Sequence, residues 1–218
     1  MNYELNESVA VLQFDDGKAN AVGHDLIDSM NEGLDRALTE AKAVVLHGRE
    51  GVFSAGFDLK EIQKGPDAAQ ALVGKGARMF LRMFTHPQPL VVACTGHAIA
   101  AGAFMLLSSD NRIGAAGDFK IGLNETAIGM TIPVFGQELA KARLDPRHLT
   151  RAYIQSQLYD PDGAIKAGYL DKVLPAEQVL DGALADAAAL AELPGGSYGQ
   201  NKLDIRAKHI AIIEASLS

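Results

Sequence analysis

Short apolar runs and apolar residues at helical spacing follow one another along the first part of the chain. Residues 8–14 (SVAVLQF) and 43–46 (AVVL) are apolar and rich in β-branched side chains, which predicts buried strands. Between them, over residues 25–39, apolar residues recur every four positions, which predicts an amphipathic helix. Strand, helix and strand in this order are typical of a right-handed parallel crossover unit in a layered α/β protein.

The same two patterns predict the elements in the rest of the chain. The fully apolar run from Leu90 to Cys94 predicts a strand, which a turn at Thr95-Gly96 and a small-residue segment connect to a helix. The other strand-like pieces are residues 112–115 and 172–174. Further helices are expected over residues 68–84, 134–144, 176–191 and 200–217. Another is expected to begin at residue 147, and a short one to lie within residues 159–174.

The stretch from Leu90 to Pro133 carries the most informative chemistry. A strand, a tight turn and a helix start leave the N–H groups of the first helical turn without internal partners, and such groups could hold a polarised carbonyl. A loop with a single acid, Glu125, follows among apolar neighbours. Upstream, the small residues of 51–60 (GVFSAGFDLK) leave space for a ligand against the main chain, although this segment taken alone is more typical of an ordinary strand-to-helix turn.

Composition and charge narrow the class of protein. The chain has 218 residues, which fits one large domain or one domain with an appendage. Hydrophobic residues make up 48% and charged residues 22%, so the disordered and fibrous classes are excluded. A net charge of -7 argues against a general nucleic-acid binder. The net charge does not exclude an anionic small-molecule ligand, because a few local lysines can hold phosphates on an acidic protein.

Neither a disulfide nor a metal site is expected. Cys94 is the only cysteine, and its apolar surroundings predict a small core residue. His24, His47 and His97 have no second His or Cys at metal-ligand spacing, so we interpret them as structural. The N-terminus carries acids where a signal peptide would carry bases, and the longest apolar run is interrupted by polar residues. We therefore expect a soluble, cytoplasmic protein without a membrane partner.

Three segments of this chain resemble motifs of the crotonase superfamily, the enoyl-CoA hydratase and isomerase family, in the family's order and spacing. A fourth resembles the family's later A…GLVD-V passage, and together the resemblance extends from Val9 to Lys208. The four segments are FSAGFDLK (53–60), GHAIAAGAFMLLSSD (96–110), IGLNETAIGMTIP (121–133) and AIKAGYLDKV (164–173).

The resemblance implies an α/β protein with the crotonase-type (ClpP/crotonase-like) fold, a β-β-α superhelix. It implies a core domain over residues 1–174 and a C-terminal helical region over residues 175–218. In the family such helices build homotrimers, often paired into hexamers. Lys202 and Lys208 in this region are candidates for phosphate contacts, including contacts to a neighbouring subunit.

The resemblance also implies an acyl-CoA thioester substrate and no separate cofactor, since coenzyme A is part of the substrate. The thioester carbonyl is expected between the backbone N–H groups of Phe57 and Ala101. The family usually has glycine at the second position, and alanine keeps the donor. The residues expected to line the acyl-CoA groove are Ala55, Gly56, Asp58, Leu59, Lys60 and Phe104.

Two acid positions of the family separate its reactions. Hydratases have a first glutamate three residues after the second donor, where this chain has Phe104, and the second family acid matches Glu125. Hydration needs one group to activate water and one to deliver a proton, whereas moving a double bond needs a single base. One acid therefore favours isomerisation, and IGLNET (121–126) is similar to the Δ3,Δ2-enoyl-CoA isomerase branch.

We therefore expect Glu125 to abstract a proton α to the thioester. An apolar wall of Phe104, Ile128 and Met130 is expected to raise the pKa of Glu125 by desolvation. Two alternatives remain. One is another crotonase-type reaction, such as hydration with Glu125 alone or thioester hydrolysis. The other is a non-catalytic acyl-CoA-binding paralogue.

Overall fold

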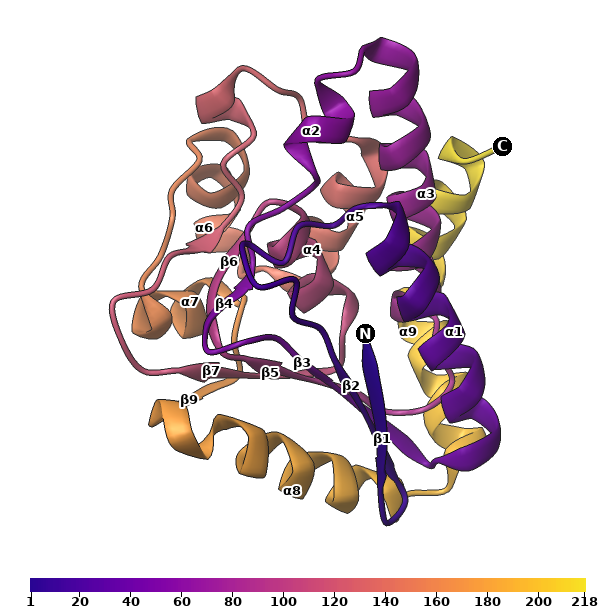
Figure 1. The fold of residues 1–218 in the computed structure, drawn as a ribbon. Coiled ribbons are helices and arrows are strands. Elements are labelled where there is room, and N and C mark those ends of the chain that lie inside the picture. The colour runs from indigo at the N-terminus through magenta and orange to yellow at the C-terminus, as the bar shows by residue number, and fades with distance from the viewer.

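A six-stranded sheet crosses the molecule in the computed structural model, which describes residues 1–218 (Figure 1). All neighbouring strands are parallel except the first two, which form an antiparallel pair. The predicted strands and the parallel crossover are confirmed. In spatial order the strands are β1 (Asn2–Asn6), β2 (Val9–Gln13), β3 (Ala43–His47), β5 (Leu90–Cys94), β7 (Asn111–Ala115) and β9 (Lys172–Leu174).

The edge strand β1 was not predicted. Polar and apolar residues alternate in its sequence, NYELN, but over only five positions, and in the structure four of the five are exposed and only Tyr3 is half-buried, so the pattern is too short to indicate a strand by itself. Its backbone pairs with β2 from Asn2 opposite Gln13 to Asn6 opposite Val9.

A second, smaller sheet consists of β4 (Gly51–Ser54), β6 (Gly96–Ile99) and β8 (Ile121–Gly122), all parallel and in that order. The sequence predicted a loop for the first of these segments and a turn for the second, and both predictions were wrong. The glycine that looks like a turn signal has another role: a Cβ on Gly96 would lie 2.1 Å from the carbonyl carbon of Gly51. Glycine permits this close approach of β4 and β6.

The predicted helices are present, with one start displaced. The last helix was expected from residue 200 but begins at Gly195, directly after Pro194. The helices are α1 (His24–Glu40), α2 (Leu59–Ile62), α3 (Pro66–Phe84), α4 (Ala101–Ser108), α5 (Val134–Arg143), α6 (Pro146–Leu149), α7 (Pro161–Ala167), α8 (Val179–Ala191) and α9 (Gly195–Ser216).

Helix α8 lies along one face of the large sheet, and α1, α3 and the small sheet lie on the other (Figure 1). Alanines at 183, 187 and 191 let α8 approach the valines and alanines of the sheet closely. The opposite face belongs to the larger core cluster, which contains the phenylalanines of α3, α4 and α5. None of the helices combines the length and the apolar character that a bilayer crossing requires.

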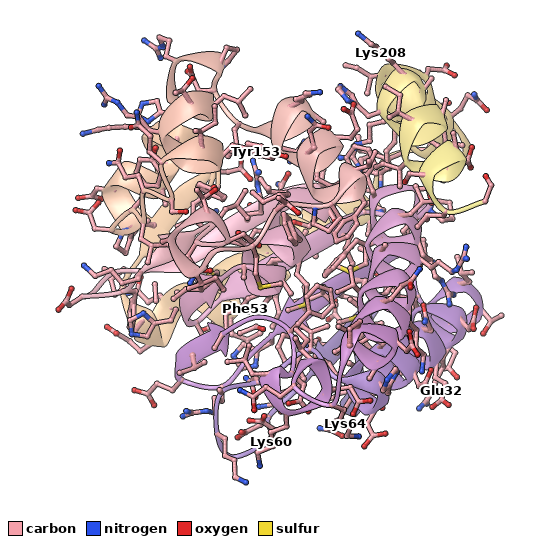
Figure 2. The ribbon with its side chains drawn as sticks, turned by 90° about the horizontal axis from the view of Figure 1, so that it is seen from above. Glu32, Phe53, Lys60, Lys64, Tyr153 and Lys208 are labelled. Carbon is pink, nitrogen blue, oxygen red and sulfur yellow. The ribbon has the colours of Figure 1, made fainter.

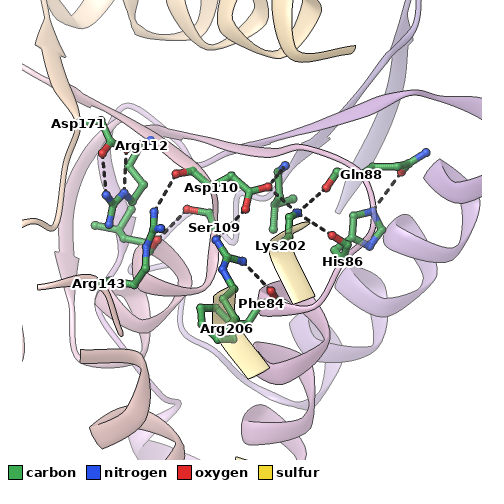
Figure 3. A network of polar contacts seen from close by, with 12 residues as sticks. Phe84, His86, Gln88, Ser109, Asp110, Arg112, Arg143, Asp171, Lys202 and Arg206 are labelled. Atoms are coloured by element: carbon green, nitrogen blue, oxygen red, sulfur yellow. Dashed lines mark hydrogen bonds and ion pairs between the residues drawn. The ribbon is translucent and has the colours of Figure 1, made fainter. Parts of the chain in front are cut away.

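A buried polar network fastens α9 to this core (Figure 3). The Asp110 carboxylate accepts hydrogen bonds from Lys202 Nζ at 2.6 Å and from an Arg206 nitrogen at 2.9 Å. Lys202 also donates to the carbonyl oxygens of His86 and Gln88. The proposed phosphate contact of Lys202 was therefore wrong, because this ammonium group is buried and fully occupied inside the protein.

Candidate active site

The small sheet brings together three segments that are far apart in the sequence. Because β4, β6 and β8 are parallel, their carboxyl ends meet at one edge of the sheet. Residues 55–57 follow β4, residues 100–101 follow the central strand β6, and residues 123–125 follow β8. Neighbouring strands lie about 4.8 Å apart. The carboxyl ends of parallel strands are also where ligands bind in many α/β proteins.

Two backbone N–H groups at this edge have directions that a carbonyl oxygen could use. Val22 donates to the Gly56 carbonyl at 2.8 Å and accepts from the Asp58 N–H at 3.2 Å. The N–H of Phe57, between them, therefore points away from Val22, and it donates to no protein acceptor. Ala101 is the first residue of α4, so its N–H has no acceptor within the helix.

Strained backbone and a glycine hold these two segments against each other. Ala100 has φ +53° and ψ −115°, a conformation that is unusual for alanine and makes the sharp turn from β6 into α4. Gly56 has φ +109°, and a Cβ there would lie 3.1 Å from the Ala100 Cβ and 3.6 Å from the Ala101 nitrogen. The predicted donors Phe57 and Ala101 are thus brought close together.

A buried amide that sequence reasoning missed supports the loop before Phe57. Asn20 is 2% exposed, and its Nδ2 donates to the carbonyl oxygens of Phe14, Val52 and Phe53. This amide ties the end of β2 to the end of β4. No spacing in the sequence indicates such a role.

The third segment presents a buried and unpaired carboxyl group. Glu125 is 6% exposed, and its Oε2 has no hydrogen-bond partner. Its backbone carbonyl accepts from the N–H groups of Ile128 and Met130, so the main chain is fixed in a tight turn while the side chain remains unpaired. Burial raises the pKa of Glu125, and the N–H groups of Asn124 and Glu125 oppose only part of this effect.

A second buried glutamate shows the contrast. Glu138 on α5 is 3% exposed, but it accepts hydrogen bonds from Lys141 at 2.9 Å and from His209 at 2.8 Å. Burial would raise the pKa of Glu138, and these two partners outweigh it and hold the pKa below its usual value. Glu125 has no such cation beside it, which suits a group that must exchange a proton.

The three residues of the expected apolar wall around Glu125 lie in different environments. Ile128 and Met130 are 55% and 40% exposed, so neither side chain is buried in the core. Phe104 is 1% exposed and packs edge-on against Phe80 and Phe135, with ring centroids 5.9 Å and 5.3 Å apart. It therefore belongs to an aromatic cluster in the core.

The remaining predicted binding residues lie on the loop and helix after β4. Asp58 caps α2 by accepting from the Lys60 N–H at 2.9 Å. Ala55, Leu59 and Lys60 are exposed. Figure 2 shows Lys60 near one edge of the molecule and Lys208 near the opposite edge. Within one chain these two lysines therefore cannot contact the same phosphate.

Comparisons with known proteins find related sequences and structures. The model of the family described as Enoyl-CoA hydratase/isomerase matches residues 4–210. Human mitochondrial enoyl-CoA delta isomerase 1 is 30% identical over 196 residues, which cover 88% of this chain and 65% of that protein. A probable enoyl-CoA hydratase from Bacillus subtilis (strain 168) is 33% identical over 135 residues, 60% of this chain and 52% of that protein. The matches thus span less than two thirds of these relatives.

Solved structures match over nearly the whole chain. The crystal structure of an enoyl-CoA hydratase/isomerase family protein from Pseudomonas syringae is 42% identical with a TM-score of 0.96, covering 99% of this chain and 94% of that one. The human mitochondrial delta3-delta2-enoyl-CoA isomerase is 27% identical with a TM-score of 0.89, covering 99% and 90%. The crotonase-type fold expected from the sequence is confirmed.

Proposed function

This chain belongs to the enoyl-CoA hydratase/isomerase family, and from that membership we propose that it is an isomerase that moves the double bond of an enoyl-CoA from the 3 to the 2 position. The observation that carries the proposal is the single buried, unpaired carboxyl group of Glu125. At the position of the first hydratase glutamate, Phe104 lies inside an aromatic cluster. One base suffices for isomerisation.

The proposed reaction has two proton transfers. Glu125 takes a proton from C2, and the electron pair of that C–H bond enters a dienolate whose negative charge lies on the thioester oxygen. The N–H groups of Phe57 and Ala101 donate to that oxygen. The protonated Glu125 then returns the proton at C4, which leaves the double bond between C2 and C3. Each such donor typically contributes about 3 to 4 kcal/mol to the stability of the transition state.

The raised pKa of Glu125 fits both steps. A general base works best when its pKa lies near the pH of the reaction. The raised pKa brings Glu125 closer to that condition than an ordinary exposed glutamate, so it can both accept and return the proton. Binding of the coenzyme A moiety is assigned, within the same proposal, to Ala55, Gly56, Asp58, Leu59 and Lys60. A homotrimer also remains a proposal.

The first experiment offers the purified protein a 3-enoyl-CoA and, separately, a 2-enoyl-CoA, and follows the absorbance of the conjugated thioester. We expect conjugation to appear from the 3-enoyl substrate. Loss of conjugation from the 2-enoyl substrate alone would instead mean hydration with one carboxylate. No change with either substrate would exclude both reactions and leave another acyl-CoA reaction or a binding role.

Replacing Gly56 by Ala is expected to lower kcat about 100-fold. The new Cβ would lie 3.1 Å from the Ala100 Cβ in a backbone conformation that alanine rarely adopts, so the segments of Phe57 and Ala101 would separate. A misplacement of about 1 Å at a reacting centre costs roughly this much. The matched control is Gly51→Ala, which also has positive φ but has no atom within 4 Å of the new Cβ. Equal losses of activity in both variants would contradict the prediction.

A further inference from the structure

Tyr169 is buried beside the candidate site with an unused hydroxyl group. The residue is 0% exposed, and its hydroxyl oxygen has no hydrogen-bond partner. A buried polar group without a partner typically costs about 1 to 3 kcal/mol, so few remain in native proteins and each one needs an explanation. In this chain the Glu125 Oε2 and the Asn124 Oδ1 are also buried without a hydrogen-bond partner.

The fold holds Tyr169 near the segment that carries Glu125. Tyr159 and Ile121, the first residue of β8, exchange two backbone hydrogen bonds of 2.9 Å. The Tyr169 ring packs against the Tyr159 ring with centroids 5.9 Å apart. Gly168, in the left-handed conformation at φ +92°, ends α7 and directs the chain into Tyr169. Tyr159 is therefore paired with the strand that immediately precedes the Glu125 loop, and Tyr169 packs against Tyr159.

The charges around this position agree with that placement. Burial raises the pKa of the Tyr169 phenol, Tyr159 and then the Glu125 carboxylate raise it further, and the Leu123 N–H acts in the opposite direction. The phenol thus remains protonated at neutral pH and has an O–H to donate. The Glu125 carboxylate also raises the pKa of Tyr153, but the hydroxyl of Tyr153 already donates to the Ile132 carbonyl. No charged side chain contributes to the pKa shift of Glu125.

The two unpaired groups are chemically complementary. An ionised carboxylate only accepts hydrogen bonds, and a tyrosine hydroxyl can donate one. We propose that Tyr169 is a positioning residue for Glu125, and that its hydroxyl donates to the Glu125 carboxylate through one bridging water. Such a hydrogen bond fixes one carboxylate oxygen and leaves the other to face the substrate. This role rests on the proposed function, because it is a role in orienting the proposed base.

The test replaces Tyr169 by Phe, which removes the hydroxyl and keeps the ring. We expect kcat to fall about 10-fold with little change in KM, since the substrate-binding residues are untouched. The proposed hydrogen bond stabilises the ionised form of Glu125, so removing it raises the pKa of Glu125. The acid limb of the pH profile of kcat should therefore move to higher pH. A wild-type kcat and pH profile together with a higher Tm would overturn the proposal, because the hydroxyl would then be only an unpaired buried group.

Tyr159→Phe is the matched control. Tyr159 is 5% exposed and packs on Tyr169, but its hydroxyl lies 3.3 Å from His148 Nδ1 and is therefore already paired. Removing it should leave the pH profile of kcat unchanged. An equal shift in both variants would mean that the effect is not specific to the Tyr169 hydroxyl, and it would contradict the proposal.

A measurement without turnover separates this proposal from the proposed function. The side-chain carboxyl carbon of Glu125 is followed by ¹³C NMR through a pH titration, with Glu125→Gln to assign the signal. A higher pKa of Glu125 in Tyr169→Phe supports positioning even if the wild type isomerises no enoyl-CoA. An unchanged pKa in a wild type that does isomerise would remove the role of Tyr169 and leave the proposed function intact.

Discussion

Replacing Glu125 by Gln is expected to lower kcat for the 3-enoyl-CoA at least about 1,000-fold. Glutamine has the same shape but cannot accept the C2 proton, and a positioned general base typically contributes 100-fold to 10,000-fold. The fold should be retained. Because burial raises the pKa of Glu125, its ionised form opposes folding at pH values above the ordinary glutamate pKa. The variant should therefore be at least as stable as the wild type at pH 8, which thermal unfolding measures.

The control for this result is Glu138→Gln at the other buried glutamate. Glu138 is paired with Lys141 and His209, which hold its pKa below the usual value although burial acts in the opposite direction. Its replacement should lower stability at neutral pH and leave kcat nearly unchanged. If Glu125→Gln retained more than about a tenth of the wild-type kcat, Glu125 would not be the base.

The large sheet and most helices could be predicted because each has a strong local pattern. The run Leu90 to Cys94 is apolar throughout and forms a strand buried on both faces, as parallel strands between layers do. The small sheet could not be predicted in the same way. Its strands have two to four residues, and Gly51 and Gly96 look like turn signals although they are points of close contact. The sheet that brings the site residues together therefore left no periodic signal.

The candidate site was partly accessible from the sequence. The correspondence of this sequence to the family motifs identified Phe57, Ala101 and Glu125. The structure brings the segments of these residues to one edge of the small sheet. The burial of Glu125 is less well explained by the expected apolar wall, since Ile128 and Met130, two of its three residues, are themselves exposed. Tyr169 lies far along the chain from Glu125, and no spacing rule connects them. Contacts of this kind depend on the tertiary fold alone.

The misassignment of Lys202 has a physical explanation. A lysine on a helix is normally solvated, so a role at the surface was the natural interpretation. Here its ammonium group meets Asp110 inside the protein, and the helix α9 that carries it is fixed against the core (Figure 3). A buried ammonium group is stable only when an opposite charge from another part of the chain lies beside it.

Replacing Asp110 by Asn is accordingly expected to lower the free energy of unfolding by about 3 to 5 kcal/mol. The ammonium of Lys202 and the guanidinium of Arg206 would remain buried without a counter-charge, which is the costly way to break a buried ion pair. For a chain of this size the loss corresponds to a Tm about 10 °C lower. Because α9 is part of the core packing, urea unfolding should show the lower midpoint with an unchanged slope.

Asp28→Asn is the matched control for that loss. Asp28 pairs with Lys75 at 2.6 Å, the same distance as Asp110 to Lys202, but the Asp28 side chain is 57% exposed. An exposed pair contributes at most about 1 kcal/mol, so a comparable loss in both variants would show that burial does not determine the effect. Burial acts to raise the pKa of Asp110, but Lys202 and Arg206 outweigh it and hold the pKa below its usual value. The contribution of Asp110 should therefore be complete above the ordinary aspartate pKa and disappear as the pH falls through the lower folded value, so the two proteins should converge in stability in acid.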